Sequence, residues 1–145
     1  MANFLCKVLL TDEALVTPKA VVDSAAGAIV EFRGAVRGRE DGREIEGIDY
    51  EAHRLMAEHQ LRTVAKEAVE RFQLRRVIVH HRVGFVPAGE ASLFLRVTAP
   101  HRSAAFEASE WIVNELKEKV PIWKRPKFKA HGRGCPTQSE PATAK

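Results

Sequence analysis

The sequence predicts an α+β domain in which helices pack against a mostly antiparallel sheet, in the order β-α-β-β-α-β-β-α. Short runs with apolar residues at alternate positions indicate strands. Two longer segments, residues 53–72 and 101–120, place apolar residues at helical spacing. The chain has 145 residues, 45% of them hydrophobic, which suits one domain with a sizeable core.

The first strand and the first helix are expected near the N-terminus. Residues 3–10 alternate loosely between apolar and polar side chains and indicate a strand. Residues 17–27 contain residue types that are typical of helix ends. Thr17 can cap a helix, Pro18 suits the first helical position, and Gly27 can end a short one. We therefore expect a short helix to follow the first strand.

Two strands are expected after this helix. The β-branched run at residues 28–34 indicates a buried strand. Asp41-Gly42 is a turn signal, so residues 36–45 are expected to form a loop between paired strands. Residues 44–51 resume the two-residue period and supply the second strand of that pair.

The second half of the chain repeats this alternation of helices and strands. Residues 53–72 form the clearest predicted helix, and residues 75–84 and 91–99 indicate two further strands. Another helix is expected at residues 101–120, where Pro121 prevents its continuation.

The domain is expected to cover residues 1–128. Residues 129–145 are rich in Gly, Pro, Ser and Thr and have almost no apolar side chains. Such a segment buries too little apolar surface to offset the entropy of ordering, so we expect a flexible polar tail.

Composition narrows the classes of function. A net charge of +4 and a pI of about 9.3 favour an anionic partner, although Asp and Glu are interspersed throughout. No apolar run reaches the roughly 20 residues that span a bilayer, and no signal peptide is evident, so we expect a cytoplasmic protein. Cys6 and Cys135 lack the spacing and His partners of a zinc site, and a disulfide is not expected in that compartment.

Three cationic clusters are candidate anion sites. They are Arg37 with Arg39, His101 with Arg102, and Lys117 with Lys124 and Arg125. His101 and Arg102 open a predicted helix, where N-terminal amides and the helix dipole favour anions. The alternative for every cluster is an ordinary solvated surface. Lys117 lies at the border of an apolar stripe, where lysine stems often pack.

Other reactive residues carry weaker predictions. His80 and His81 lie in a strand, so one is expected on each face, and structural roles are favoured for both. Trp123 is expected to be a packing anchor. The sequence shows no Ser/His/Asp order, phosphate-cradling loop or HExxH metal motif. The residues alone therefore predict an α+β domain with an anion site built from Arg, His and Lys.

Longer motifs carry a resemblance to a known family. FRGAVRG, YEAHRLMAEHQL and HHRVGFVPAGEASLFLRVTAPHRSAAFEASEWIVNELKEKVPIWKR together resemble the MoaE family, the large, catalytic subunit of molybdopterin synthase. The resemblance covers roughly residues 28–125. HRSAAF and LKEKVPIWK are its most specific pieces, and their order and separation also fit.

The resemblance implies a fold, a reaction and partners. It implies an α/β-hammerhead fold and a homodimer, in which each chain binds one small ubiquitin-like sulfur carrier, giving a heterotetramer. The carrier's C-terminal Gly-Gly bears a thiocarboxylate. Two sulfur transfers convert cyclic pyranopterin monophosphate (precursor Z) into the dithiolene of molybdopterin. The resemblance implies no cofactor, metal, nucleic acid or membrane.

Carried over by position, the resemblance implies a set of substrate contacts. They fall on Ala35, Val36, Arg37, His101, Arg102, Lys117, Lys124, Arg125 and Pro126. Lys117 is implied to act nearest the chemistry, where it stabilises negative charge or moves a proton, with Lys124 in support. Pro121 and Trp123 are expected to set the backbone angle that brings both lysines to one pocket.

The chain also departs from the family's pattern. Pro126 stands where many relatives have an acidic residue, Ala35 stands where some have lysine, and the tail lacks a tryptophan. Two rival functions are an anion- or RNA-binding module without catalysis, and an inactive subunit that binds the ubiquitin-like partner. The joint presence of the predicted cations argues against both: Arg37, His101, Arg102, Lys117 and Lys124.

Overall fold

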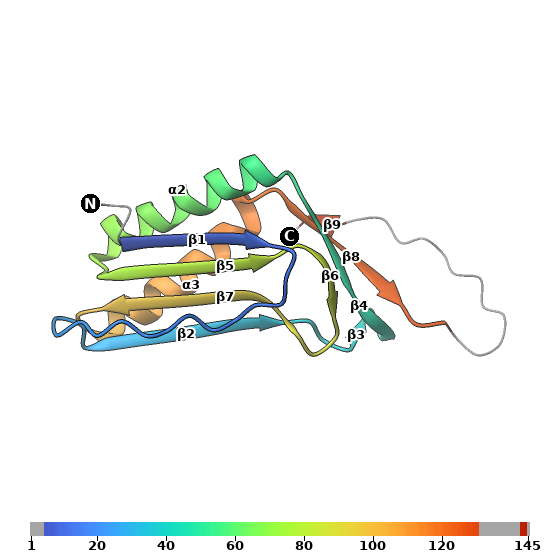
Figure 1. Ribbon diagram of the computed structural model, residues 1–145, viewed down its shortest axis with the longest axis horizontal. Coiled ribbons are helices and arrows are strands. Elements are labelled where there is room, and N and C mark those ends of the chain that lie inside the picture. The colour runs from blue at the N-terminus through green and yellow to red at the C-terminus, as the bar shows by residue number, and fades with distance from the viewer. Residues whose placement is uncertain (1–4, 131–142, 145) are drawn as a thin grey trace.

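The computed structural model describes residues 5–130 and 143–144, which form two sheets and two long helices (Figure 1). The strands are β1 (Cys6–Thr11), β2 (Ala28–Ala35), β3 (Arg39–Glu40), β4 (Arg43–Ala52), β5 (Arg76–Arg82), β6 (Gly84–Pro87), β7 (Ala91–Ala99), β8 (Ile122–Phe128) and β9 (Thr143–Ala144). The helices are α2 (Arg54–Phe72) and α3 (Arg102–Lys119). The predicted α+β class is confirmed, since all strand pairs except β1–β5 are antiparallel.

The two sheets lie at an angle to each other. The first has the strand order β1-β5-β7-β2, and the second has the order β3-β4-β8-β9 with β6 paired to β4. Figure 1 shows α2 and α3 on one face of the four-stranded sheet and the second sheet crossing its end. The other face of the four-stranded sheet, here called the open face, is crossed by the segment between β1 and β2.

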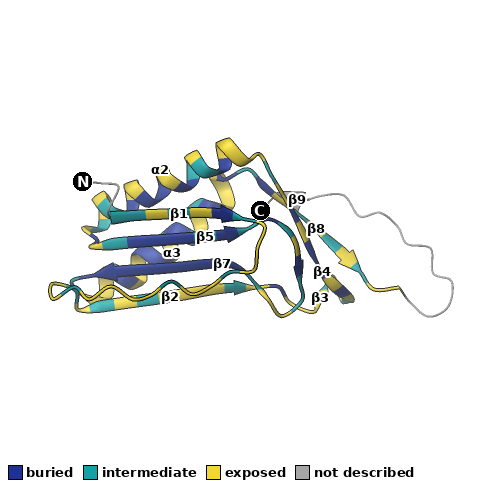
Figure 2. Cartoon of the chain, viewed as in Figure 1, coloured by how far each residue is buried: buried dark blue, intermediate teal, exposed yellow. Residues whose placement is uncertain are grey.

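The core lies between the two helices and the four-stranded sheet (Figure 2). The central strands β5 and β7 are the most deeply buried, as in Val77 and Leu95. The helices contribute apolar faces that include Leu61 of α2 and Ile112 of α3. This packing fixes α3 against the sheet, so the two ends of α3 occupy defined places.

The two long predicted helices and the five predicted strands are present. The segments 53–72 and 101–120 become α2 and α3, and the segments 3–10, 28–34, 44–51, 75–84 and 91–99 become β1, β2, β4, β5 and β7. Among the described residues, no helix combines the length and the apolar character that crossing a bilayer requires.

The short helix predicted at residues 17–27 is wrong. The segment runs over the open face without helical structure. Arg96 donates to the carbonyl oxygens of Pro18 at 2.8 Å and Lys19 at 3.2 Å. Arg33 donates to the hydroxyl of Thr17 at 2.6 Å, so this side chain does not cap a helix. Contacts with the sheet therefore override the local helix signals.

The prediction of a buried strand at residues 28–34 is wrong in one respect. The strand is present as β2, but it lies at the edge of its sheet and none of its residues is buried. Ile29 is 54% exposed and Phe32 is 39% exposed. An apolar run cannot by itself distinguish a central strand from an edge strand that another surface covers.

The turn predicted at Asp41-Gly42 is confirmed, but its partners differ from those expected. Both residues have positive φ, 51° and 73°, and they join β3 to β4. The strands before and after residues 36–45 are β2 and β4, which belong to different sheets. The loop therefore connects two sheets, and the hairpin at its tip lies entirely in the second.

Four strands of the second sheet were not predicted. Two are short: β3 in the predicted loop and β9 in the predicted tail. The others are β6, between the two predicted strands of the second half, and β8, which contains Pro126. Residues alternate in β8, so Ile122 is buried while Trp123 is 38% exposed. The packing anchor after α3 is therefore Ile122, and the prediction for Trp123 is wrong.

The predicted tail falls largely outside the described residues, as does Cys135. Within the described part, the amide of Lys129 donates to the carbonyl of Glu44 at 3.0 Å, and β9 pairs with β8. The domain boundary after residue 128 stays a prediction.

Candidate functional site

The candidate site lies where the end of α3 meets the second sheet. The helix ends at Lys119, the amide of Val120 still donates to the carbonyl of Leu116 at 3.2 Å, and Pro121 follows. The carbonyl of Pro121 accepts from the amide of His53 at 3.3 Å, which fixes the exit against the start of α2. The chain then enters β8, so the last turn of α3 and the first residues of β8 are held as one unit.

Lys117 lies on the last turn of α3, beside a small apolar cavity of about 30 Å³. The lysine is exposed, whereas most of the cavity wall is buried and apolar. The other lining residues are Leu61, His81, Leu93, Val113, Leu116, Val120 and Ile122. An ammonium group beside an apolar wall is shielded from water on that side, so it interacts more strongly with developing negative charge than a fully solvated one.

Lys124 and Arg37 are brought together by an acid that was not predicted. Lys124 Nζ lies 3.4 Å from Glu40 Oε1, and Arg37 lies 3.9 Å from Glu40 Oε2. The Glu40 side chain is only 19% exposed, while that of Arg37 is 81% exposed. Glu40 therefore links the turn after β2 to β8 and leaves the guanidinium of Arg37 accessible.

Two buried polar side chains, Tyr50 and His81, connect the strand position of Lys124 to the cavity beside Lys117. Tyr50 is opposite Lys124 in the β4–β8 register, and its ring meets that of buried His81 edge-on with centroids 5.5 Å apart. The Tyr50 hydroxyl donates to Ser92 Oγ at 3.2 Å, which lies 3.3 Å from the carbonyl of Gly34. His81 also lines the cavity beside Lys117.

The protonation of these two side chains follows from their surroundings. Burial raises the pKa of the Tyr50 phenol, the hydrogen bond to Ser92 opposes that shift, and the charge of Glu40 adds to it. His81 Nδ1 lies 2.8 Å from the carbonyl of Arg82, which only accepts, so Nδ1 carries a proton. Tyr50 and His81 are therefore both hydrogen-bonded inside the domain, next to the candidate site.

Two further predicted contacts, Ala35 and Val36, come directly before Arg37. Val36 is buried, its amide donates to the carbonyl of Glu90 at 2.9 Å, and its carbonyl accepts from Gly89 at 2.8 Å. Val36 therefore anchors the turn that carries Arg37, and Ala35 before it is exposed. These contacts hold the turn close to β7.

Arg125 and Pro126 follow Lys124 along β8. Successive residues of a strand point to opposite faces, so Pro126 shares the face of Lys124 and Arg125 does not. Arg125 instead lies 3.6 Å from Glu51 and lines a separate surface cavity. The predicted set is therefore split across the sheet.

His101 and Arg102 lie at the opposite end of α3. Both are exposed and line a surface cavity of about 420 Å³ with Gly27, Pro100 and Ser103. Fifteen helical residues separate Arg102 from Lys117, which corresponds to about 22 Å along the helix axis. One chain therefore does not bring all the predicted contacts together.

Sequence reasoning did not identify Glu40, Tyr50 or His81 as members of the site. A signal was present for Tyr50, which falls on the buried phase of the alternating strand β4. Glu40 precedes the Asp41-Gly42 turn, and nothing in the sequence indicates that it contacts Arg37 and Lys124. In the described part of the chain, no group of three His, Cys, Asp or Glu residues is arranged to hold a metal ion.

Fold and site together define a two-sheet α+β domain with cationic groups at both ends of its second long helix, one of them backed by a buried Tyr–His pair. The family model described as "MoaE protein" matches residues 10–119. The chain belongs to the MoaE family.

Individual relatives agree with this membership. A "Molybdopterin synthase catalytic subunit" from Oryza sativa subsp. japonica is 46% identical over 105 residues, which are 72% of this chain and 54% of that protein. The chain thus matches about half the length of this relative. A crystal structure of molybdopterin synthase from Staphylococcus aureus has a TM-score of 0.77 at 29% identity, covering 86% of this chain and 92% of that one.

A further structure has the same fold at lower identity. It is a "Protein-protein complex of subunit 1 and 2 of Molybdopterin-converting factor" from Helicobacter pylori, with a TM-score of 0.63 and 20% identity. The alignment covers 86% of this chain and 85% of that one.

Proposed function

We propose that this chain is the catalytic subunit of a molybdopterin synthase, a sulfurtransferase of molybdenum cofactor biosynthesis. Its substrate is cyclic pyranopterin monophosphate, and the sulfur comes from the thiocarboxylated C-terminus of a small ubiquitin-like subunit. The observation that carries the proposal is the contact of Glu40 with both Arg37 and Lys124 on the strand that follows α3, together with Lys117 beside an apolar cavity on the last turn of that helix. The named relatives support the reaction, and the fold shared with the two-subunit complex supports the partner.

The substrate is an anion, and the site offers cations to hold it. Arg37 is accessible and can place its planar fork on a phosphate, while Glu40 keeps Lys124 beside it. His101 and Arg102 complete the site in this proposal, but only when a second copy supplies them, because α3 separates them from Lys117 within one chain.

The edge of β2 offers a route to that second copy. Within the described residues β2 pairs only with β7, so its outer edge carries unsatisfied backbone groups. Antiparallel pairing of two β2 edges places the start of one strand beside the end of the other. His101 and Arg102 lie near the start of β2, since Ala28 pairs with Ala99, and Arg37 follows its end. A homodimer of this kind brings the two cationic ends together.

The sulfur carrier delivers its group to Lys117. A Gly-Gly tail has no side chains, so it can lie extended in a narrow channel with its acyl sulfur at the mouth of the apolar cavity. The thiocarboxylate sulfur forms a bond to a side-chain carbon of the pterin as an oxygen on that carbon leaves as water. Water then attacks the acyl carbon of the carrier and breaks its bond to sulfur, so the carrier ends as a carboxylate. Lys117 stabilises the negative charge on the acyl oxygen during this exchange. The reaction suits the cytoplasm, which keeps sulfur groups reduced.

Reconstitution tests the proposal directly. The chain is mixed with precursor Z and a thiocarboxylated small subunit, and molybdopterin is measured. We expect product with the complete mixture, and none when the small subunit is omitted or lacks its last two glycines. Conversion of precursor Z by inorganic sulfide alone, as fast as with the thiocarboxylated partner, would contradict the role of the tail channel.

A further inference from the structure

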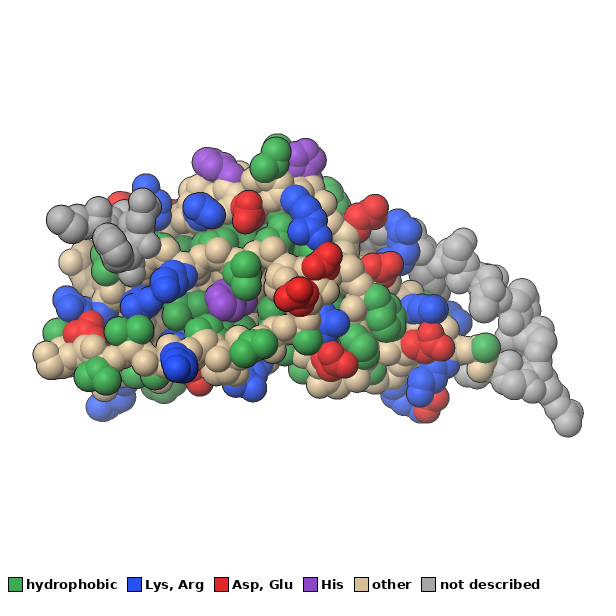
Figure 3. Space-filling view, viewed as in Figure 1, with side chains coloured by type: hydrophobic (Ala, Val, Ile, Leu, Met, Phe, Trp, Pro, Cys, Tyr) green, Lys and Arg blue, Asp and Glu red, His purple; other side chains and the backbone are tan. Residues whose placement is uncertain are grey.

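The open face of the four-stranded sheet and the adjoining β1 edge hold two neighbouring cavities that the proposed reaction does not use. One, of about 140 Å³, lies under the segment between β1 and β2, and the other, of about 390 Å³, lies between β1 and α2. They meet along the β1–β5 pair, since Ile78 lines the first and its register neighbour Lys7 lines the second. Figure 3 shows this face, with most of its acidic side chains toward the end that carries β6.

The cations around these cavities fall into two groups. Arg75 is paired with Asp23 at 2.9 Å, and Arg96 is held by Glu31 and by two backbone carbonyls. Among the described residues, the second group forms no ion pair within 4 Å. Its members are Lys7, Arg62, Lys66 and Arg76. Four cations without a direct acidic contact therefore line the two cavities, with Glu70 the acid near Cys6.

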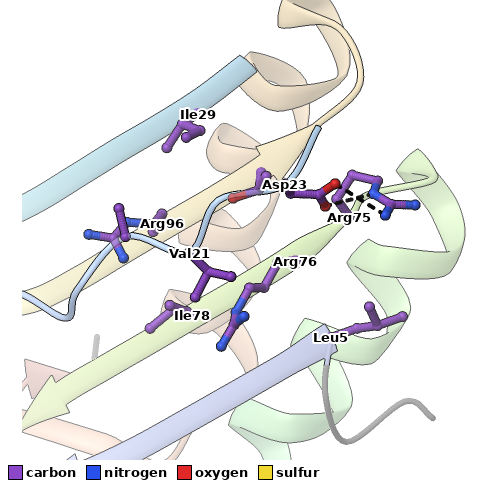
Figure 4. A pocket seen from close by; sticks show the side chains of 10 residues that line it. Leu5, Val21, Asp23, Ile29, Arg75, Arg76, Ile78 and Arg96 are labelled. Carbon is purple, nitrogen blue, oxygen red and sulfur yellow. Dashed lines mark hydrogen bonds and ion pairs between the residues drawn. The ribbon is translucent and has the colours of Figure 1, made fainter. Parts of the chain in front are cut away.

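Arg76 provides the most specific observation. Its Nε is buried without a hydrogen-bond partner in the described structure, and a buried polar nitrogen of this kind calls for an acceptor. Figure 4 shows its guanidinium reaching from β5 toward β1, away from the Asp23–Arg75 ion pair. Lys7 points to the same face from β1, opposite Ile78, so its Cα lies about 8 Å from that of Arg76. Both side chains are long enough to reach one anion between them.

The pKa of His80 is affected by the cations of this surface. This histidine lies on the open face of β5 and lines the second cavity. Burial lowers the pKa of its imidazole, and the charges of Arg96 and Lys7 lower it further. An anion bound beside it offsets those charges.

We propose that the open face binds a small molecule that carries a phosphate group, with the phosphate between Arg76 and Lys7. Arg62 and Lys66 of α2 flank it and supply further charge. Apolar side chains of the open face contact the body of the ligand, among them Leu9 and Ile78. Four cations suit one or two phosphates, whereas a nucleic-acid strand needs a longer basic track. This site is separate from the proposed sulfur-transfer site and does not depend on it.

Pyrophosphate is the probe that tests the proposal, with amide chemical shifts of the full chain as the readout. We expect the amides of Lys7, Arg76 and Ile78 to shift on titration and to report their own dissociation constant. The pKa of His80 should rise when the probe is bound. The double variant Lys7→Gln, Arg76→Gln should weaken binding at these amides at least about tenfold, because it removes two charged contacts. Shifts near Lys124 should persist.

The control is Lys129→Gln, which removes one exposed cation at the far end of the chain's second sheet. It should leave open-face binding unchanged. If the double variant does not fold, the single change at exposed Lys7 is expected to weaken binding about threefold or more. The proposal is overturned if the open-face amides do not respond to pyrophosphate. It is also overturned if they respond as strongly in the Lys7 and Arg76 variants as in the unchanged chain. It is also overturned if they shift with protein concentration alone, because a second copy then covers the face.

Discussion

The two ends of α3 carry similar charges in different surroundings. At the N-terminal end, His101 and Arg102 are exposed around an open surface cavity, and the side chain of His101 makes no capping hydrogen bond. At the C-terminal end, Lys117 faces a buried apolar wall, and Lys124 is tied to Glu40. The cations at the N-terminal end are therefore accessible. At the C-terminal end, one cation lies beside apolar side chains and another is paired with an acid.

This difference separates binding from chemistry. A solvated cation contributes modest attraction to an anion, whereas a cation beside a water-poor cavity interacts more strongly with charge that develops during a reaction. We therefore expect the C-terminal end to govern the rate of sulfur transfer. The N-terminal end should govern how tightly the substrate is held, once a second copy presents it.

Replacing Lys117 should have the largest effect. Lys117→Ala removes the ammonium at the cavity mouth, and we expect product formation to fall by at least about 100-fold. Because the side chain is exposed, the free energy of unfolding should change by roughly 0.5 kcal/mol or less. The measurement is molybdopterin formation, beside urea unfolding. Lys119→Ala is the matched control, and equal activity in both variants would remove the special role of Lys117.

Mixing two inactive variants should show whether the ends of α3 meet across a dimer. At substrate concentrations well below the KM, Lys117→Ala and Arg102→Ala are each expected to be nearly inactive alone, the first because sulfur transfer slows and the second because the substrate binds weakly. After subunit exchange, half of the dimers are mixed and each has one intact site, so about a quarter of wild-type activity should return. A mixture of Lys117→Ala with Lys124→Ala alters the same end twice and should recover nothing. Absence of recovery in the first mixture, with exchange verified, would show that the ends do not share a site.

Removing the acid that links Arg37 and Lys124 should have a smaller effect. Glu40→Ala frees Lys124 to move, so we expect kcat to fall about tenfold. The KM should not rise, because the change removes a negative charge from an anion site. Steady-state kinetics separate the two quantities. Glu44→Gln on the same hairpin is the control, and a rise in KM without a fall in kcat would contradict the positioning role of Glu40.

The smallest effect should come from the buried tyrosine. Tyr50→Phe removes the hydrogen bond to Ser92 and should lower the free energy of unfolding by about 1 kcal/mol. The folded state raises the pKa of Tyr50 above its unfolded value of 10.0, so this part of the stability is present below pH 10 and lost as pH rises through the folded pKa. Urea unfolding at neutral pH and above pH 10 should show that the free energy of unfolding falls less with rising pH in the variant than in the unchanged chain. An equal fall in both would contradict the raised pKa of Tyr50.

The helices and the central strands could be predicted because local pattern and burial agree there. In α2 and α3 the apolar stripes meet the sheet, and β7 is buried along nearly its whole length, with Leu93, Phe94 and Leu95 at its centre. The segment at residues 17–27 had the signals of a helix, but its carbonyls accept hydrogen bonds from Arg96, which is 78 residues away from Pro18. Such contacts depend on the tertiary fold and cannot be derived from local propensity.

The motifs predicted the cations of the candidate site, which stay a prediction, but not their partners. In the structure Lys117 lies on the last turn of α3, and Glu40 contacts both Lys124 and Arg37. Glu40 escaped prediction because an acid beside a turn is ordinarily solvated. The split of Arg125 from Lys124 escaped because β8, with a proline and three cations, does not have the composition of a typical strand.

The length of α3 makes the two ends of the helix a matched pair. A helix advances 100° and about 1.5 Å with each residue, so one added residue in its middle would turn Lys117 away from its cavity while Arg102 stayed in place. Seven added residues would nearly restore the angle but separate the ends by a further 10 Å or so. The number of residues between the two cationic ends is therefore as much a part of the site as the residues themselves, and insertions should be confined to the loops outside α3.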